Sequence, residues 1–74
     1  MPNATELTTK LALAVAQRSE VEATHNGLTF TIWYDEYIPV ITVFHPEDGV
    51  LLEELASSKP EIMGELLAPW INGG

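Results

Sequence analysis

The pair Asn26-Gly27 constrains the fold of this chain more than any other feature of its sequence. The segments on either side of it, 21–25 and 28–32, alternate between apolar and polar residues, which is typical of half-buried β-strands. Asn-Gly is the preferred centre of a two-residue type I′ turn, because both central residues need positive φ. A hairpin through this turn pairs His25 with Leu28, Ala23 with Phe30 and Val21 with Ile32 on one face, and Glu22 with Thr31 and Thr24 with Thr29 on the other.

The segment before the hairpin predicts a helix from about Ala4 to Arg18. Asn3, followed by Glu6 three residues later, forms a variant capping box at its start. Apolar residues then recur at helical spacing: Leu7, Leu11, Ala14 and Val15.

The segment after the hairpin predicts a second turn, with Asp35-Glu36 at its tip, and a third strand ending at Phe44. This register places Ile41 and Val43 on the inner face, opposite Phe30 and Leu28. Three pairs lie on the outer face: Trp33–Ile38, Thr31–Val40 and Thr29–Thr42.

The last third of the chain predicts two helices. His45–Gly49 breaks the strand, and the apolar residues in 50–56 then indicate a short helix. Pro60 is suited to the first position of another helix, which Pro69 ends or kinks. Residues 71–74 are expected to be a frayed tail.

The fold class predicted from these elements is α+β, with one compact domain over residues 1–74. The order α-β-β-β-α-α favours a two-layer sandwich, in which helices cover one face of a three-stranded antiparallel meander. This order resembles the α-β-β-β-α scaffold of double-stranded-RNA-binding domains. The chain lacks the basic cluster that such domains use on phosphates, so RNA binding is not implied.

The charge of the chain predicts the kind of partner. Its 74 residues include 11 acids and 3 Lys and Arg, for a net charge of −8. Direct binding to nucleic acid or to an anionic membrane is disfavoured, whereas a basic protein surface would be attracted. Cysteine is absent, which excludes disulfides and thiolate chemistry. The start of the chain lacks the features of a signal peptide, so a cytoplasmic location is expected.

The outer face of the predicted sheet is unusually apolar. Trp33, Ile38, Val40 and Phe44 all fall on it, so the third strand is expected to be buried on both sides. Such a face needs a cover. The cover could be the C-terminal helix with Trp70, a second copy of the chain or another protein.

No catalytic or metal site is predicted, and no cofactor. His45, Glu47 and Asp48 are typical of a turn rather than of a metal site, which needs three or four convergent ligands. His25 is expected to be a hairpin residue. The aromatic residues around the second turn are favoured interface anchors.

We therefore expect a non-enzymatic interaction module that docks on a basic surface of a partner protein. Where that surface binds nucleic acid, the module would act as an inhibitor or nucleic-acid mimic. In its size, acidity and lack of catalytic groups the chain resembles small phage-encoded inhibitors, including anti-CRISPR proteins. The alternative is a homodimeric structural or adaptor subunit that pairs through the outer sheet face. The residues expected to contact the partner are Trp33, Tyr34, Asp35, Glu36, Tyr37, Ile38, Val40, Phe44, Glu47 and Asp48.

Overall fold

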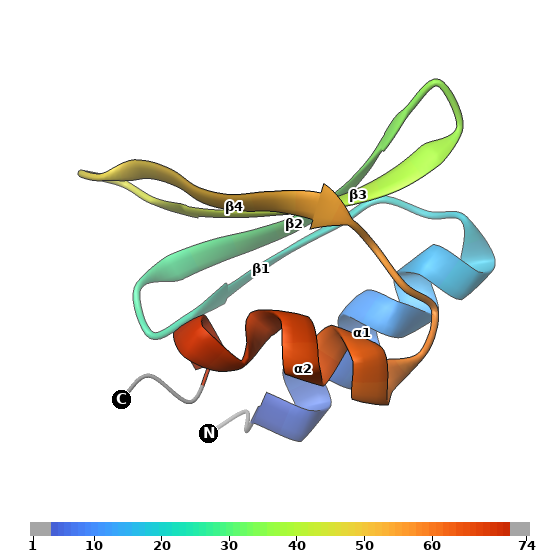
Figure 1. Ribbon diagram of the computed structural model, residues 1–74, viewed down its shortest axis with the longest axis horizontal. Helices are drawn as coiled ribbons and strands as arrows, with labels where there is room; N and C mark the ends of the chain where they lie inside the picture. The colour runs from blue at the N-terminus through green and yellow to red at the C-terminus, as the bar shows by residue number, and fades with distance from the viewer. Residues whose placement is uncertain (1–3, 72–74) are drawn as a thin grey trace.

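The computed structural model describes residues 4–71 and places two helices on one side of a four-stranded antiparallel sheet (Figure 1). The strand order is β1-β2-β3-β4, so every strand pairs with its neighbour in sequence. The α+β class is confirmed, but the predicted three-stranded meander is wrong by one strand. The elements are α1 (Ala4–Gln17), β1 (Val21–His25), β2 (Leu28–Asp35), β3 (Ile38–His45), β4 (Gly49–Leu55) and α2 (Pro60–Ile71).

The first hairpin has the predicted register. Val21 pairs with Ile32 and His25 pairs with Leu28, with Asn26 and Gly27 at the tip. Both tip residues have positive φ, 53° and 78°, as a type I′ turn requires. The turn preference and the alternation of the strands therefore act together to set this pairing.

The second hairpin turns one residue later than predicted. Glu36 and Tyr37 form its tip with φ of 50° and 75°, and Asp35 pairs with Ile38 as the last residue of β2. Trp33 consequently pairs with Val40, so the register differs from the predicted one by two residues. Because side chains alternate with a period of two, this slip leaves every residue on its predicted face.

The predicted helix over 50–56 is wrong, because this segment forms β4. Gly49 has φ of 80° and closes a short turn from β3. The pairing of β4 with β3 shifts register between Val43 and Phe44, as at a β-bulge. This irregularity lets the consecutive residues Leu51 and Leu52 both pack against the core. The local pattern therefore imitates helical spacing although the segment is extended.

The core lies between the inner face of the sheet and the two helices. Trp70 of α2 is partly buried against it, so this residue does not cover the outer face. α2 continues past Pro69 to Ile71, whose side chain is 7% exposed and is therefore not frayed. The predicted cap at Asn3 and the rest of the predicted tail, residues 72–74, lie outside the described residues. The largest fully buried side chains are Phe30, Leu11, Ile32, Ile41, Met63, Leu67 and Val43.

Candidate protein-interaction face

The outer face is the side of the sheet that faces away from the two helices (Figure 1). The strand registers arrange its residues in rows. Residues paired across antiparallel strands share a face, so each row runs across the strands. Three rows cross the outer face: Trp33–Val40–Leu55, Glu22–Thr31–Thr42–Glu53 and Thr24–Thr29–Phe44–Val50.

The row through Trp33 forms one apolar corner of the outer face. The indole Nε1 of Trp33 donates a hydrogen bond of 2.7 Å to the Thr42 hydroxyl, which fixes the ring on the sheet. Val40 is only 8% exposed although it lies outside the helix-covered core, so outer-face neighbours bury it. Leu55 and Ile38, by contrast, are 69% and 49% exposed. The corner is thus partly closed by its own side chains and partly bare.

A second apolar corner lies at the other end of the strands. Phe44 is half-buried there, and its cross-strand partner Val50 is 63% exposed. Sequence reasoning missed Val50 and Leu55 because it assigned their segment to a helix. The Pro-Glu-Asp-Gly run before β4 could have revealed this strand, because such a run between apolar segments is typical of a turn.

The excess of acidic over basic residues is confined to one layer of the molecule. Residues 19–58, which contain the whole sheet, carry eight Asp and Glu and no Lys or Arg. The remaining three acids are balanced by the three basic residues, all of which lie on or next to the helices. The net charge of −8 is therefore the charge of the sheet layer alone. Its acids are Glu20, Glu22, Asp35, Glu36, Glu47, Asp48, Glu53 and Glu54.

The second turn combines an exposed tip with a fixed base. Tyr37 is 85% exposed at the tip, and Asp35 and Glu36 beside it are exposed. Arg18, directly after α1, donates a hydrogen bond of 2.6 Å to the Tyr37 carbonyl oxygen. The same guanidinium lies 5.1 Å from the ring centroid of Tyr34. Arg18 therefore links the end of α1 to the β2–β3 hairpin.

Tyr34 differs from the other predicted contact residues, because it packs against the core on the inner face. Its hydroxyl lies 3.2 Å from the Ala14 carbonyl oxygen and 3.1 Å from that of Ser19, so these two acceptors share one proton. This contact joins β2 to the last turn of α1 and to the residue Ser19 just after it. Tyr34 is thus positioned to anchor the hairpin rather than to face a partner.

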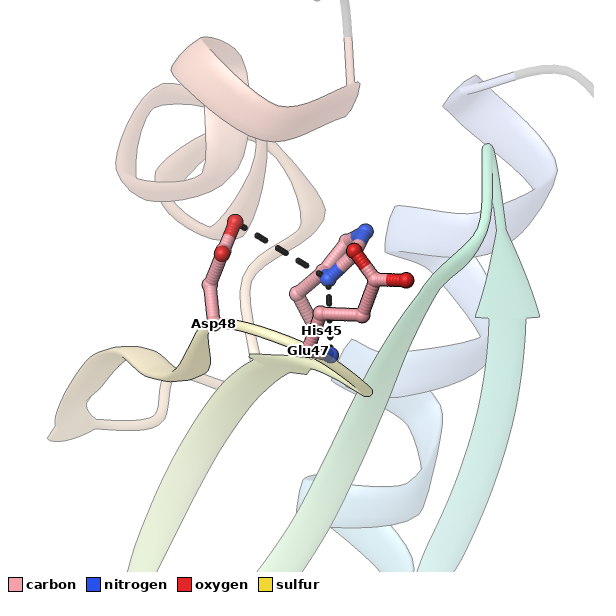
Figure 2. Close-up of polar contacts among 3 residues, drawn as sticks. All are labelled: His45, Glu47 and Asp48. Carbon is pink, nitrogen blue, oxygen red and sulfur yellow. Dashed lines mark hydrogen bonds and ion pairs between the residues drawn. The ribbon is translucent and has the colours of Figure 1, made fainter.

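His45 makes a local hydrogen bond within the turn between β3 and β4 (Figure 2). His45 Nδ1 accepts a hydrogen bond of 3.0 Å from the Glu47 backbone N–H. In this arrangement Nδ1 carries no proton, and Asp48 Oδ2 at 3.8 Å from it makes only a contact. Among residues 4–71, no three His, Asp or Glu side chains gather into a set that could hold a metal ion.

A hollow of about 420 Å³ lies between α1 and β1 and is lined in part by His25, Glu22 and Lys10. Strand alternation places His25 and Glu22 on opposite faces of β1, so the two groups do not converge on one point. His25 Nε2 instead lies 3.4 Å from the Ile71 carbonyl oxygen. His25 and Glu22 therefore do not form an acid–base pair in this hollow, which Glu6 also lines.

Comparisons with known proteins give no relative from which a function could be transferred. No protein-family model, curated protein or solved structure matches the chain. Neither α1 nor α2 has the length and apolarity that a membrane-spanning helix needs. The outer face, with its two apolar corners and its surrounding carboxylates, is the candidate functional site.

Proposed function

We propose that the chain is a non-enzymatic interaction module that docks its outer face on a basic surface of another protein. The observation that carries this proposal is the segregation of charge, since the sheet layer holds the entire net charge of −8. Carboxylates around an apolar contact speed the encounter with a basic partner, while the apolar groups contribute most of the affinity. Trp33 at the first corner and Phe44 at the second supply large apolar contacts.

A basic protein surface of this kind often binds nucleic acid. A module that covers it with carboxylates competes with phosphates for the same Lys and Arg side chains. In that setting the chain acts as an inhibitor or nucleic-acid mimic, like the small phage-encoded inhibitors that it resembles in size and acidity.

A homodimer through the outer face is the alternative, and the bare side chains of Ile38, Val50 and Leu55 favour some form of cover. Face-to-face pairing would bring two sheet layers together, each with eight carboxylates and no Lys or Arg. Their mutual repulsion opposes such a dimer, most strongly at low salt. The charge distribution therefore favours a basic partner over a second copy.

The experiment starts with capture of the partner from a nuclease-treated lysate, followed by binding kinetics with the purified partner. We expect the affinity to fall as salt rises, and nucleic acid to compete for the partner. The double variant D35K/E36K should slow association at low salt, whereas the control E61K/E65K makes the same charge change on α2 and should slow it much less.

Two results would overturn the proposal. One is an equal loss of association rate in the two double variants, which would show that only net charge matters. The other is a stable dimer by light scattering whose mass is insensitive to salt, which would favour the homodimeric subunit.

A further inference from the structure

A small hollow lies where β1 begins, next to Trp33. Its volume is about 270 Å³. Glu22 is paired with Thr31 on the outer face, and Glu20 precedes the pair Val21–Ile32 by one residue. Glu20, directly before β1, and Glu22 both line this hollow. The residues that line the hollow are Glu20, Val21, Glu22, Thr31, Ile32 and Trp33.

The aromatic wall of this hollow is held in place. Trp33 Nε1 is hydrogen-bonded to Thr42, so the indole is fixed by its edge and the π faces of the ring take no part in that bond. Tryptophan is the aromatic side chain that binds cations most strongly through its face. A ring fixed before binding also loses little side-chain entropy when a ligand packs on it.

The charged groups of the wall are both carboxylates. Glu20 and Glu22 are exposed, and neither forms an ion pair with any residue in the range 4–71. Within the same range, the buried Oγ1 of Thr31 has no hydrogen-bond partner. No Lys or Arg is among the residues that line the hollow. The hollow is therefore anionic, with one aromatic wall.

We infer that this hollow receives an arginine side chain of the partner protein. A guanidinium group is planar, so it can stack on the indole while its N–H groups donate to two carboxylates. A lysine ammonium satisfies the charge but cannot stack in this way, and an anionic ligand would be repelled. The inference rests on the proposed function and names the side chain by which the basic partner engages the sheet.

The test uses the variant Trp70→Phe, which leaves Trp33 as the only tryptophan. Its fluorescence is titrated with three peptides of equal length, in which glycine alternates with arginine, lysine or citrulline. We expect the arginine peptide to change the emission of Trp33 and to bind about tenfold more tightly than the lysine peptide. The citrulline peptide should bind weakest. NMR of the original chain, following the indole N–H of Trp33, gives the same readout independently of Trp70→Phe.

A matched pair of variants locates the site. E20Q/E22Q and E47Q/D48N each remove two negative charges from the sheet layer, the first at the hollow and the second at the β3–β4 turn. We expect about a tenfold loss of arginine-peptide affinity in E20Q/E22Q and less than about threefold in E47Q/D48N. Equal losses, equal affinity for arginine and lysine, or an unchanged Trp33 signal would each overturn the arginine site. The proposed function would survive all three results, because its own test measures the salt dependence and the Asp35–Glu36 effect with the partner.

Discussion

The two hairpins of the sheet allow a direct exchange of their turn residues. Both tips have positive φ at both central residues, but one is Asn26-Gly27 and the other is Glu36-Tyr37. A non-glycine residue in the left-handed region costs about 1–2 kcal/mol, whereas glycine there costs nothing sterically and loses about 0.5–1 kcal/mol more backbone entropy on folding. The difference predicts that E36N/Y37G stabilises the fold by about 1 kcal/mol.

The structure indicates that little else changes in this variant. The Tyr37 side chain is 85% exposed, and the Arg18 hydrogen bond is made to the backbone carbonyl of residue 37, which glycine retains. For a domain of this size, about 1 kcal/mol corresponds to a rise in Tm of about 4–8 °C, measured by calorimetry or by urea unfolding. The reverse exchange, N26E/G27Y, is the control and should lower stability by a similar amount or more.

A lower or unchanged Tm for E36N/Y37G would refute this account of the turn. The same variant also tests the proposed interface. Backbone strain that persists at an exposed tip is typical of functional sites. We therefore expect E36N/Y37G to bind the partner more weakly although it is more stable.

Three further predictions concern the outer face and its attachment to α1. Thr31→Val removes a buried hydroxyl without a partner in residues 4–71 and should raise the free energy of unfolding by about 1 kcal/mol. Thr42→Val deprives the Trp33 indole of its acceptor and should lower the free energy of unfolding by about 1–2 kcal/mol. Urea unfolding measures both changes, and the opposite order of stability would contradict the assignment. Arg18→Met removes the hydrogen bond to Tyr37 and the contact with the Tyr34 ring, and should cost about 1–2 kcal/mol in the same assay; an unchanged midpoint would show that the hairpin is not held by α1. Val40→Glu should weaken partner binding or self-association while circular dichroism still reports both helices, and an unaltered affinity and mass would remove this row from the interface.

The sequence was sufficient for the first hairpin and the first helix because independent signals agreed there. The Asn-Gly turn and the strand alternation require the same register. The second turn lacked such agreement, since Glu36-Tyr37 has no intrinsic preference for positive φ and depends on its context, including the Arg18 contact. The face assignments nevertheless survived, because the error in register was an even number of residues.

The fourth strand could not be recognised from periodicity, and this affected the candidate site. Its register irregularity places Leu51 and Leu52 against the core together, which breaks the alternation that identifies a strand. The site consequently lacked Val50 and Leu55 on the outer face. It also included Tyr34, although the alternation of β2 already indicated the inner face for this residue.

The reassignment of β4 changes the geometry that the proposed partner would have to match. Glu22 and Glu53 lie at opposite ends of one row that crosses all four strands through Thr31 and Thr42. At a strand spacing of about 4.8 Å, these two positions are about 14 Å apart. The apolar corners lie on either side of this row, and the four residue steps along β3 from Val40 to Phe44 separate them by about 13 Å. A surface complementary to this face would need two basic groups about 14 Å apart across the strand direction. It would also need two apolar groups about 13 Å apart along the strand direction. A three-stranded sheet could not demand this arrangement, because Glu53 would then lie on a helix.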